Sequence, residues 1–408
     1  MIPRFRLILP SIVALVLAAA AGLAHAQQAI SLAEADLRAA SLFQQAASTG
    51  MVLVVVRNRE VMVKGYGETA PGSGMKPDAQ SLIRLCSLSK VFTGELLLDF
   101  SNEGKLRLDD PLQRFAPAHR LVPKGTLGTP ITLEELATHT SGVAREVGAY
   151  PPKIPHFTFP DYAQRWAWLP RQKLLFRPGT AALYSNVGFD LLGDALASAA
   201  HKPYAQILNE RIVGPLGLRD TTLSPGSGQC VRLLRGSGDE GACTDTQASG
   251  ASGGVYSTGT DMVRVLEHLL QIPGTGVPPV PPGPGISVYL KPGELKSTQG
   301  LSHAGEPTGI GLAWIQIGDP ATPSAILQKT GGGAGFETYI ALSPKMHAGV
   351  FFAVTEGKGD SQVDLYHEAN VLLAALANVP ELPAKIRSTP APRKRPTHRR
   401  SPNGRGTP

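Results

Sequence analysis

Residues 86–100, CSLSKVFTGELLLDF, combine a Ser-x-x-Lys motif with the start of an amphipathic helix. The apolar side of this helix is formed by residues at intervals of four: Phe92, Leu96 and Phe100. Residues three apart face the same side of a helix, so Lys90 should place its amine beside the Ser87 hydroxyl. An amine kept nearly neutral by desolvation can accept the hydroxyl proton, and the unpaired N–H groups at the helix start can help to bind an oxyanion. The motif predicts Ser87 as a nucleophile and Lys90 as its activator.

A Ser-x-x-Lys spacing is by itself weak, because a chain of this composition contains it about once by chance. Ser73 and Lys76 have the same spacing, but they lie in a Gly-rich stretch between Pro71 and Pro77. No helix follows that would hold this lysine over the serine. We interpret this second match as coincidental, so the assignment of Ser87 depends on further motifs.

The second motif is Tyr184-Ser185-Asn186, directly before a predicted helix. A purely structural role is open, with Ser185 or Asn186 as N-cap and Tyr184 in the core. A Tyr-x-Asn string is expected only about 0.15 times by chance. A phenol beside Lys90 can relay protons, and the Asn186 amide can bind a substrate amide and orient the lysine.

The third motif is Lys329-Thr330-Gly331, on a predicted strand edge and followed by two more glycines. A glycine hairpin with an exposed lysine is the structural alternative, although the string is expected only about 0.1 times by chance. Lys329 and Thr330 can bind a substrate carboxylate, and the glycines, Gly331 among them, let a peptide-like substrate approach the backbone. The Gly332 N–H is the predicted second oxyanion donor, beside the N–H of Ser87.

The remaining pattern predicts an α+β fold whose one antiparallel sheet is built from both ends of the chain. Strands are expected at 52–56, 61–66, 311–317, 324–328, 336–342 and 348–355. Helices are expected at 31–48, 88–102, 132–139, 189–200, 204–212, 261–271 and 361–378. We expect a discontinuous sheet lobe formed by residues 27–85 and 300–380. A mostly helical lobe is expected at 86–299, and it includes a Pro/Gly-rich loop at 273–292.

The N-terminus has the pattern of a secretory signal peptide. Arg4 and Arg6 precede an apolar stretch at 7–23, and Ala24-His25-Ala26 is a small-x-small cleavage pattern. We expect cleavage after Ala26 and a periplasmic location in a cell with an outer membrane. A transmembrane anchor is the alternative, which the early Pro10 and the good cleavage pattern disfavour.

The C-terminal tail, 381–408, carries the excess of positive charge. The formal net charge is +7, yet the residues from Pro383 onward include eight Lys or Arg and no acid, so the body is slightly acidic. Rich in proline and poor in apolar residues, the tail is predicted to be disordered. It could bind anionic lipid, nucleic acid or acidic wall polymer, or remain a solvated extension. The solvated extension is the favoured interpretation; peripheral contact with membrane or wall stays open, and nucleic acid is not an expected partner.

The three cysteines permit one disulfide in an oxidising compartment. Cys230 and Cys243 flank a Gly- and Ser-rich loop and are the expected pair. Cys86 is then left as a buried free thiol. No histidine lies near it in sequence to activate it as a nucleophile.

The three motifs in this order resemble those of the serine β-lactamase and penicillin-binding protein superfamily, and the Tyr-x-Asn element is similar to its class C branch. Supporting strings are THTSG at 138–142, PLGL at 215–218 and GGVYST at 253–258. Stretches at 131–141, 184–196 and 328–333 look like the AmpH-type D-alanyl-D-alanine carboxypeptidase/endopeptidases. Cys86 departs from the pattern, since a small residue is expected before the nucleophile.

The resemblance implies a sheet flanked by N- and C-terminal helices, with the active site in the cleft to the helical lobe. It implies that Ser87 forms an acyl-enzyme, Lys90 and Tyr184 share acid and base roles, and Asn186 orients. Lys329 and Thr330 would bind the substrate carboxylate. The implied substrates are peptidoglycan stem peptides and β-lactams, with no metal and no cofactor. The order of importance of Lys90 and Tyr184 as bases and the oligomeric state stay open.

Four functions remain in competition at this stage. A DD-peptidase and a class C β-lactamase use the same residues and differ in how fast water clears the acyl-enzyme. An esterase of this fold would leave the carboxylate site idle. A non-catalytic wall-binding protein is disfavoured because every motif residue is present.

Overall fold

The computed structural model describes residues 28–149, 151, 154–238, 241–278, 288–359 and 361–382. The expected signal peptide, the tail beyond residue 382 and the centre of the Pro/Gly-rich loop lie outside these ranges. Within them, no helix has both the length and the apolar character that crossing a bilayer requires.

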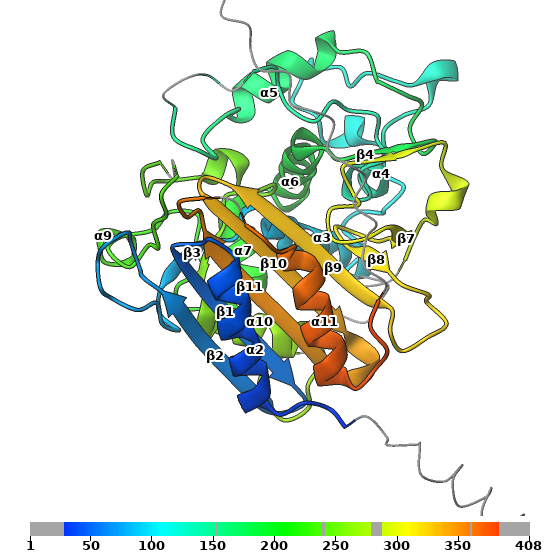
Figure 1. Cartoon of the computed structure of the whole chain (residues 1–408). Coiled ribbons are helices and arrows are strands. Elements are labelled where there is room, and N and C mark those ends of the chain that lie inside the picture. The colour runs from blue at the N-terminus through cyan, green and yellow to red at the C-terminus, as the bar shows by residue number, and fades with distance from the viewer. Residues whose placement is uncertain are drawn as a thin grey trace, which may run out of the picture.

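The centre of the fold is a seven-stranded antiparallel sheet with the strand order β2-β1-β11-β10-β9-β8-β7 (Figure 1). Its strands are β1 (Gly50–Arg57), β2 (Glu60–Gly67), β7 (Pro307–Ile310), β8 (Ile315–Ile317), β9 (Ile326–Gly333), β10 (Phe336–Ser343) and β11 (Ala348–Thr355). β1 pairs along its length with β11, so the two ends of the chain build one sheet, as predicted.

Helices cover both faces of this sheet, which explains why β1 is apolar from Met51 to Val56. Val52, Val54 and Val56 enter one core and the alternate residues of β1 enter the other, because side chains alternate across a strand. α2 (Leu32–Gln45) and α11 (Leu365–Ala377) lie together on one face, and α10 (Gly259–Leu269) packs on the other (Figure 1). α2 begins at the predicted capping box of Ser31 and Glu34.

One predicted strand is wrong over half of its length. The strand expected at 311–317 begins only at Ile315, because the Gly311 N–H donates to the Trp314 carbonyl over 2.8 Å and closes a turn. Ala313 has a φ of 69°, which no strand contains. The apolar residues of this turn are buried, so their pattern imitates a strand.

The chain between β2 and β7 supplies most of the helices. They are α3 (Ser89–Asn102), α4 (Leu133–Ala137), α5 (Tyr162–Trp168), α6 (Asn186–Ala200), α7 (Tyr204–Leu208), α8 (Gly214–Leu216), α9 (Ser227–Cys230) and α10. Two short pairs complete it: β3 (Leu82–Arg84) with β5 (Tyr256–Thr258), and β4 (Ala182–Leu183) with β6 (Thr298–Gln299). α10 belongs in sequence to the range assigned to the helical lobe but packs on the sheet, so our division into lobes stays a proposal.

α5 was not predicted from the sequence; a buried ion pair holds it on α6. Arg165 donates to both carboxylate oxygens of Asp194 over 2.6 Å, and the Trp166 indole N–H donates to the same carboxylate over 2.8 Å. Both charged side chains are less than a tenth exposed. Periodicity within seven residues cannot reveal a helix whose stability depends on such a distant partner.

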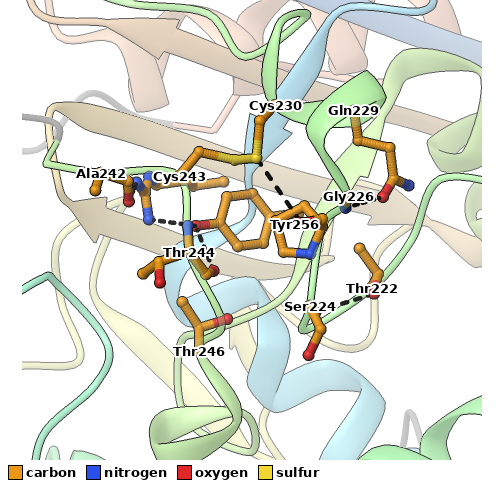
Figure 2. The surroundings of a disulfide bond; sticks show 12 residues. Thr222, Ser224, Gly226, Gln229, Cys230, Ala242, Cys243, Thr244, Thr246 and Tyr256 are labelled. Atoms are coloured by element: carbon orange, nitrogen blue, oxygen red, sulfur yellow. Dashed lines mark hydrogen bonds between the residues drawn. A yellow bond between two sulfur atoms is a disulfide. The ribbon is translucent and has the colours of Figure 1, made fainter.

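Cys230 and Cys243 are joined by a disulfide, and Cys86 is buried and free. Figure 2 shows the bridge beside Tyr256, whose hydroxyl donates to the Thr244 carbonyl over 3.2 Å. Arg84 at the end of β3 donates to the Tyr256 hydroxyl and to the Ala242 carbonyl, each over 2.8 Å. The bridged loop therefore packs against the strand that leads to Ser87.

Replacing both bridged cysteines, Cys230→Ser with Cys243→Ser, is expected to lower the free energy of unfolding by about 3 kcal/mol, because the bridge restricts the unfolded chain. Denaturant unfolding with and without reductant measures this. Reductant should destabilise the parent and leave the variant unchanged. Equal stability of parent and variant under oxidising conditions would contradict the expectation.

Candidate active site

Ser87 lies in a single 3-10 turn, Cys86–Leu88, that leads directly into α3. The Ser89 hydroxyl holds this turn: it donates to the Cys86 carbonyl over 2.7 Å and accepts from the Val255 N–H over 3.0 Å. Ser87 is half-buried whereas its neighbours in sequence are buried. The turn thus leaves the Ser87 side chain partly exposed in a segment that is otherwise buried.

Cys86 packs behind the nucleophile position. Its thiol contacts the Gly333 carbonyl on β9 at 3.3 Å. Burial raises the pKa of Cys86 to about 12. The thiol therefore stays protonated and acts as a packing group.

Lys90 is fully buried one turn after Ser87. Its Nζ donates to the Ser87 hydroxyl over 3.3 Å, to the Asn186 side-chain carbonyl over 2.7 Å and to the Ser252 backbone carbonyl. Burial lowers the pKa of Lys90 to about 7, against the attraction of the Asp190 and Glu146 carboxylates. The amine is thus poised to exchange a proton at neutral pH.

Asn186 is held from both ends of its amide. It is the first residue of α6, and the N-cap is Ser185, whose hydroxyl accepts from the Gly188 N–H over 2.9 Å. The Asn186 carbonyl accepts from Lys90, and its NH₂ group donates to Glu146 over 2.5 Å. These two partners fix the amide orientation beside the lysine.

Tyr184, at the end of β4, lies between the two lysines of the motifs. The centre of its ring is 4.9 Å from Lys90 Nζ and 4.7 Å from Lys329 Nζ. Arg145 lies 5.0 Å from the same ring. Three basic side chains around one aromatic ring indicate a site that attracts negative charge.

Lys329 and Thr330 lie where β9 loses its second neighbour. β8 pairs with β9 only as far as Gln328, so in the described chain 329–333 has no strand on that side. Lys329 is buried, which lowers the pKa of its amine, and Tyr184 opposes this shift. The free backbone edge and the lysine can together bind an extended substrate ending in a carboxylate.

Gly331 allows β9 to close on the turn that carries Ser87. A Cβ at this position would lie 2.2 Å from the Thr338 hydroxyl and 2.8 Å from the Leu85 carbonyl. The Thr338 hydroxyl donates to that same carbonyl over 2.9 Å. Any side chain at position 331 would push the strand away from the nucleophile.

Ser87, Asn186 and Gly332 line one cavity of about 280 Å³. The three motifs, which lie far apart in the chain, thus meet at one place between α3, α6 and β9. Ser73 and Lys76 do not join them: the Ser73 hydroxyl contacts Thr69, and no bond to the cavity residues involves either side chain.

Sequence reasoning missed several polar residues of this site. Asp190 and Glu146 line the cavity with Arg145. His139 accepts the Ser185 N–H through Nδ1 over 3.1 Å, and its ring lies 4.4 Å from that of Tyr184. Burial, then Lys329 and Lys90, hold the pKa of His139 well below its usual value, so the ring is neutral. For Asp190 a signal existed, since it is a lone carboxylate in the apolar run 187–192.

Comparison with known proteins places this geometry in a wider group. A family model described as Beta-lactamase matches residues 33–375. The chain is 39% identical over 336 residues to the D-alanyl-D-alanine-carboxypeptidase/endopeptidase AmpH of Escherichia coli K12, covering 81% of this chain and 87% of that protein. It is 25% identical to a beta-lactamase of Pseudomonas fluorescens, covering 82% and 96% of the two chains.

Solved structures agree with these matches. The beta-lactamase/D-alanine carboxypeptidase of Yersinia pestis, a complex with citrate, superposes with a TM-score of 0.78 at 39% identity, over 82% of this chain and 95% of that one. The D-alanine carboxypeptidase AmpC of Burkholderia cenocepacia has a TM-score of 0.66 at 22% identity, over 84% and 98% of the chains, and supports the fold alone. The α+β fold predicted from the sequence is confirmed.

Proposed function

Because the chain belongs to the beta-lactamase family of serine hydrolases, we propose that it is a DD-peptidase that cleaves D-alanine-terminated stem peptides and crosslinks of peptidoglycan. The observation that carries this proposal is the cluster of Lys90, Tyr184 and Lys329 next to Ser87, whose hydroxyl Lys90 contacts and which itself lines the cavity. The name of the Escherichia coli relative supports the choice of substrate.

In the proposed reaction, the Ser87 oxygen attacks the carbonyl carbon of the scissile amide. Its proton passes to the amine of Lys90, either directly or relayed by the hydroxyl of Tyr184, and the backbone N–H groups of Ser87 and Gly332 stabilise the oxyanion. The carbon–nitrogen bond then breaks, and the leaving amine takes the proton. This step leaves an acyl-enzyme on Ser87 and releases D-alanine or the amine side of a crosslink.

Water completes the cycle. It attacks the acyl ester, gives one proton to the same base and releases Ser87 when that proton returns to its oxygen. Asn186 keeps the base in place through the hydrogen bond from Lys90. A β-lactam would acylate Ser87 in the same way, and the rate of this second step decides between a peptidase and a class C β-lactamase.

We place this enzyme outside the cytoplasm, in the periplasm of a cell with an outer membrane. The proposal rests on the N-terminal signal pattern with cleavage after Ala26, and a disulfide between Cys230 and Cys243 is compatible with such a compartment. For the basic tail we propose contact with the membrane surface or the wall. Unchanged sedimentation with membranes and wall after truncation at residue 382 would exclude an anchoring role.

The test of the function uses the purified mature protein with two substrates in parallel: muropeptides ending in D-Ala-D-Ala and a chromogenic cephalosporin. D-Ala release and crosslink cleavage with poor cephalosporin turnover are expected. Fast cephalosporin turnover with intact muropeptides would instead establish the alternative, a class C β-lactamase.

Replacing Lys329 with alanine (Lys329→Ala) separates a peptidase from an esterase. We expect kcat/KM for D-Ala-D-Ala peptides to fall about 10- to 100-fold, mainly through KM, because a charge-assisted bond to the substrate carboxylate is lost. Hydrolysis of a neutral ester should change much less. Equal losses on both substrates would contradict a carboxylate-binding role.

A further inference from the structure

The cavity beside Ser87 contains a buried carboxylate that the reaction does not use. Asp190 lies one turn after Asn186 on α6, and its side chain lines the cavity. It is 3% exposed, and its Oδ1 atom has no hydrogen-bond partner. An unpaired buried carboxylate oxygen is costly, so such a group calls for a partner.

The neighbouring basic side chains, Lys90 and Arg165, donate their hydrogen bonds to groups other than Asp190. The three hydrogens of a Lys90 ammonium are taken by Ser87, Asn186 and the Ser252 carbonyl. Arg165 gives two N–H groups to Asp194, and its remaining bonds go to the Pro160 and Ala248 carbonyls. Neither donates to Asp190. Burial raises the pKa of Asp190 to about 7, and the charge of Arg165, a side-chain hydrogen bond with Ser252 and the charge of Lys90 oppose this rise.

The rest of the wall suits a flexible aliphatic chain. Phe157 forms one apolar side, packed so closely on Gly253 that a Cβ there would lie 2.8 Å from its ring. Val147 and Phe159 line the same space. Glu146 is exposed, so one carboxylate lies at the mouth and another at depth.

Two further basic residues belong to the wall. Arg145 is 3.6 Å from Glu146 and lies over the Tyr184 ring, so it partly neutralises the outer carboxylate. His156 also lines the cavity. Of the two carboxylates, that of Asp190 is therefore the better placed to form an ion pair with a bound substrate cation.

We infer that this cavity binds a substrate side chain made of an aliphatic arm that ends in an ammonium group, with Asp190 as its main anion and Glu146 at the entrance. The assignment of the side chain to the acyl part of a stem peptide rests on the proposed function. Asp190 would then select substrates by the residue that precedes the D-alanines.

The test compares two peptides, Nα-acetyl-L-Lys-D-Ala-D-Ala with a free side-chain amine and the same peptide acetylated on that amine. The parent enzyme should cleave the free amine about tenfold or more faster in kcat/KM, as expected for a hydrogen bond between charged groups. Asp190→Asn should remove most of this preference. Glu146→Gln should reduce it less, since its carboxylate is exposed.

Two results would overturn the inference. One is equal cleavage of both peptides by the parent enzyme, which needs no variant to fold. The other is an Asp190→Asn variant that slows both peptides by the same factor and keeps their ratio, because Asp190 would then act on Lys90 alone.

A failure of the proposed function is distinguishable from these results. If the parent cleaves neither peptide, the rates of acylation of Ser87 by two reagents are compared instead, and intact mass measures each rate. The reagents are a penicillin whose acyl side chain ends in an amine and its acetylated counterpart. A tenfold preference for the free amine that Asp190→Asn removes would support the site, and equal rates would overturn it.

Discussion

Replacing Ser87 with alanine (Ser87→Ala) is expected to abolish covalent labelling by penicillin and to lower the rate of D-Ala release about 10⁴-fold or more, because no acyl-enzyme can form. The fold should persist, since the bonds that hold the turn belong to Ser89. Intact mass after incubation with penicillin and the rate of D-Ala release measure the two effects.

The matched control is Ser73→Ala, which changes the serine of the other Ser-x-x-Lys spacing. In the parent, the Ser73 hydroxyl contacts the Thr69 hydroxyl and the Ala70 N–H, and not the cavity residues. This variant should keep labelling and activity. Labelling that survives Ser87→Ala but disappears in Ser73→Ala would refute the assignment of the nucleophile.

Replacing Lys90 with methionine (Lys90→Met) is expected to lower kcat/KM about 10²- to 10⁴-fold, the range of a lost general base. Methionine keeps much of the aliphatic volume in a fully buried place. Lys90→Arg should be as inactive, because a guanidinium stays protonated and cannot accept the proton. An active Lys90→Arg enzyme would contradict a base role for this residue.

The pH profile of the parent enzyme gives an independent measurement of the same group. Since burial lowers the pKa of Lys90 to about 7, the neutral amine prevails above that pH and the ammonium below it. The rate should therefore fall about tenfold per pH unit below 7 and level off above it. If Tyr184 is the main base, the fall in rate below pH 7 will disappear in Tyr184→Phe and remain in Lys90→Met.

Much of the site was predictable because its elements are local. The helix period places Lys90 over Ser87 from their spacing alone, and Lys90 Nζ lies 3.3 Å from the Ser87 hydroxyl. The apolar runs of β1 and β11 predicted that both ends of the chain join one sheet, and their register confirms it. These relations need only the regular geometry of helices and strands.

Other parts were out of reach because they depend on distant partners. Arg165 meets Asp194 on another helix and so holds α5, which no local pattern indicates. The contact of Asn186 with Lys90 across 96 positions was expected, but from the motif and the family resemblance and not from local geometry. The misplaced strand before Ile315 failed for a related reason, since buried residues of a turn have the same composition as a strand.

The nucleophile candidate, the order of the three motifs and the fold class could be derived from the sequence, because spacing and periodicity act within a few residues. Three properties follow from tertiary packing alone: Tyr184 lies between two lysines, the pKa of Lys90 is lowered, and the Oδ1 atom of the cavity residue Asp190 has no hydrogen-bond partner. Burial and Coulomb forces set these properties, and both depend on which segments pack together in space.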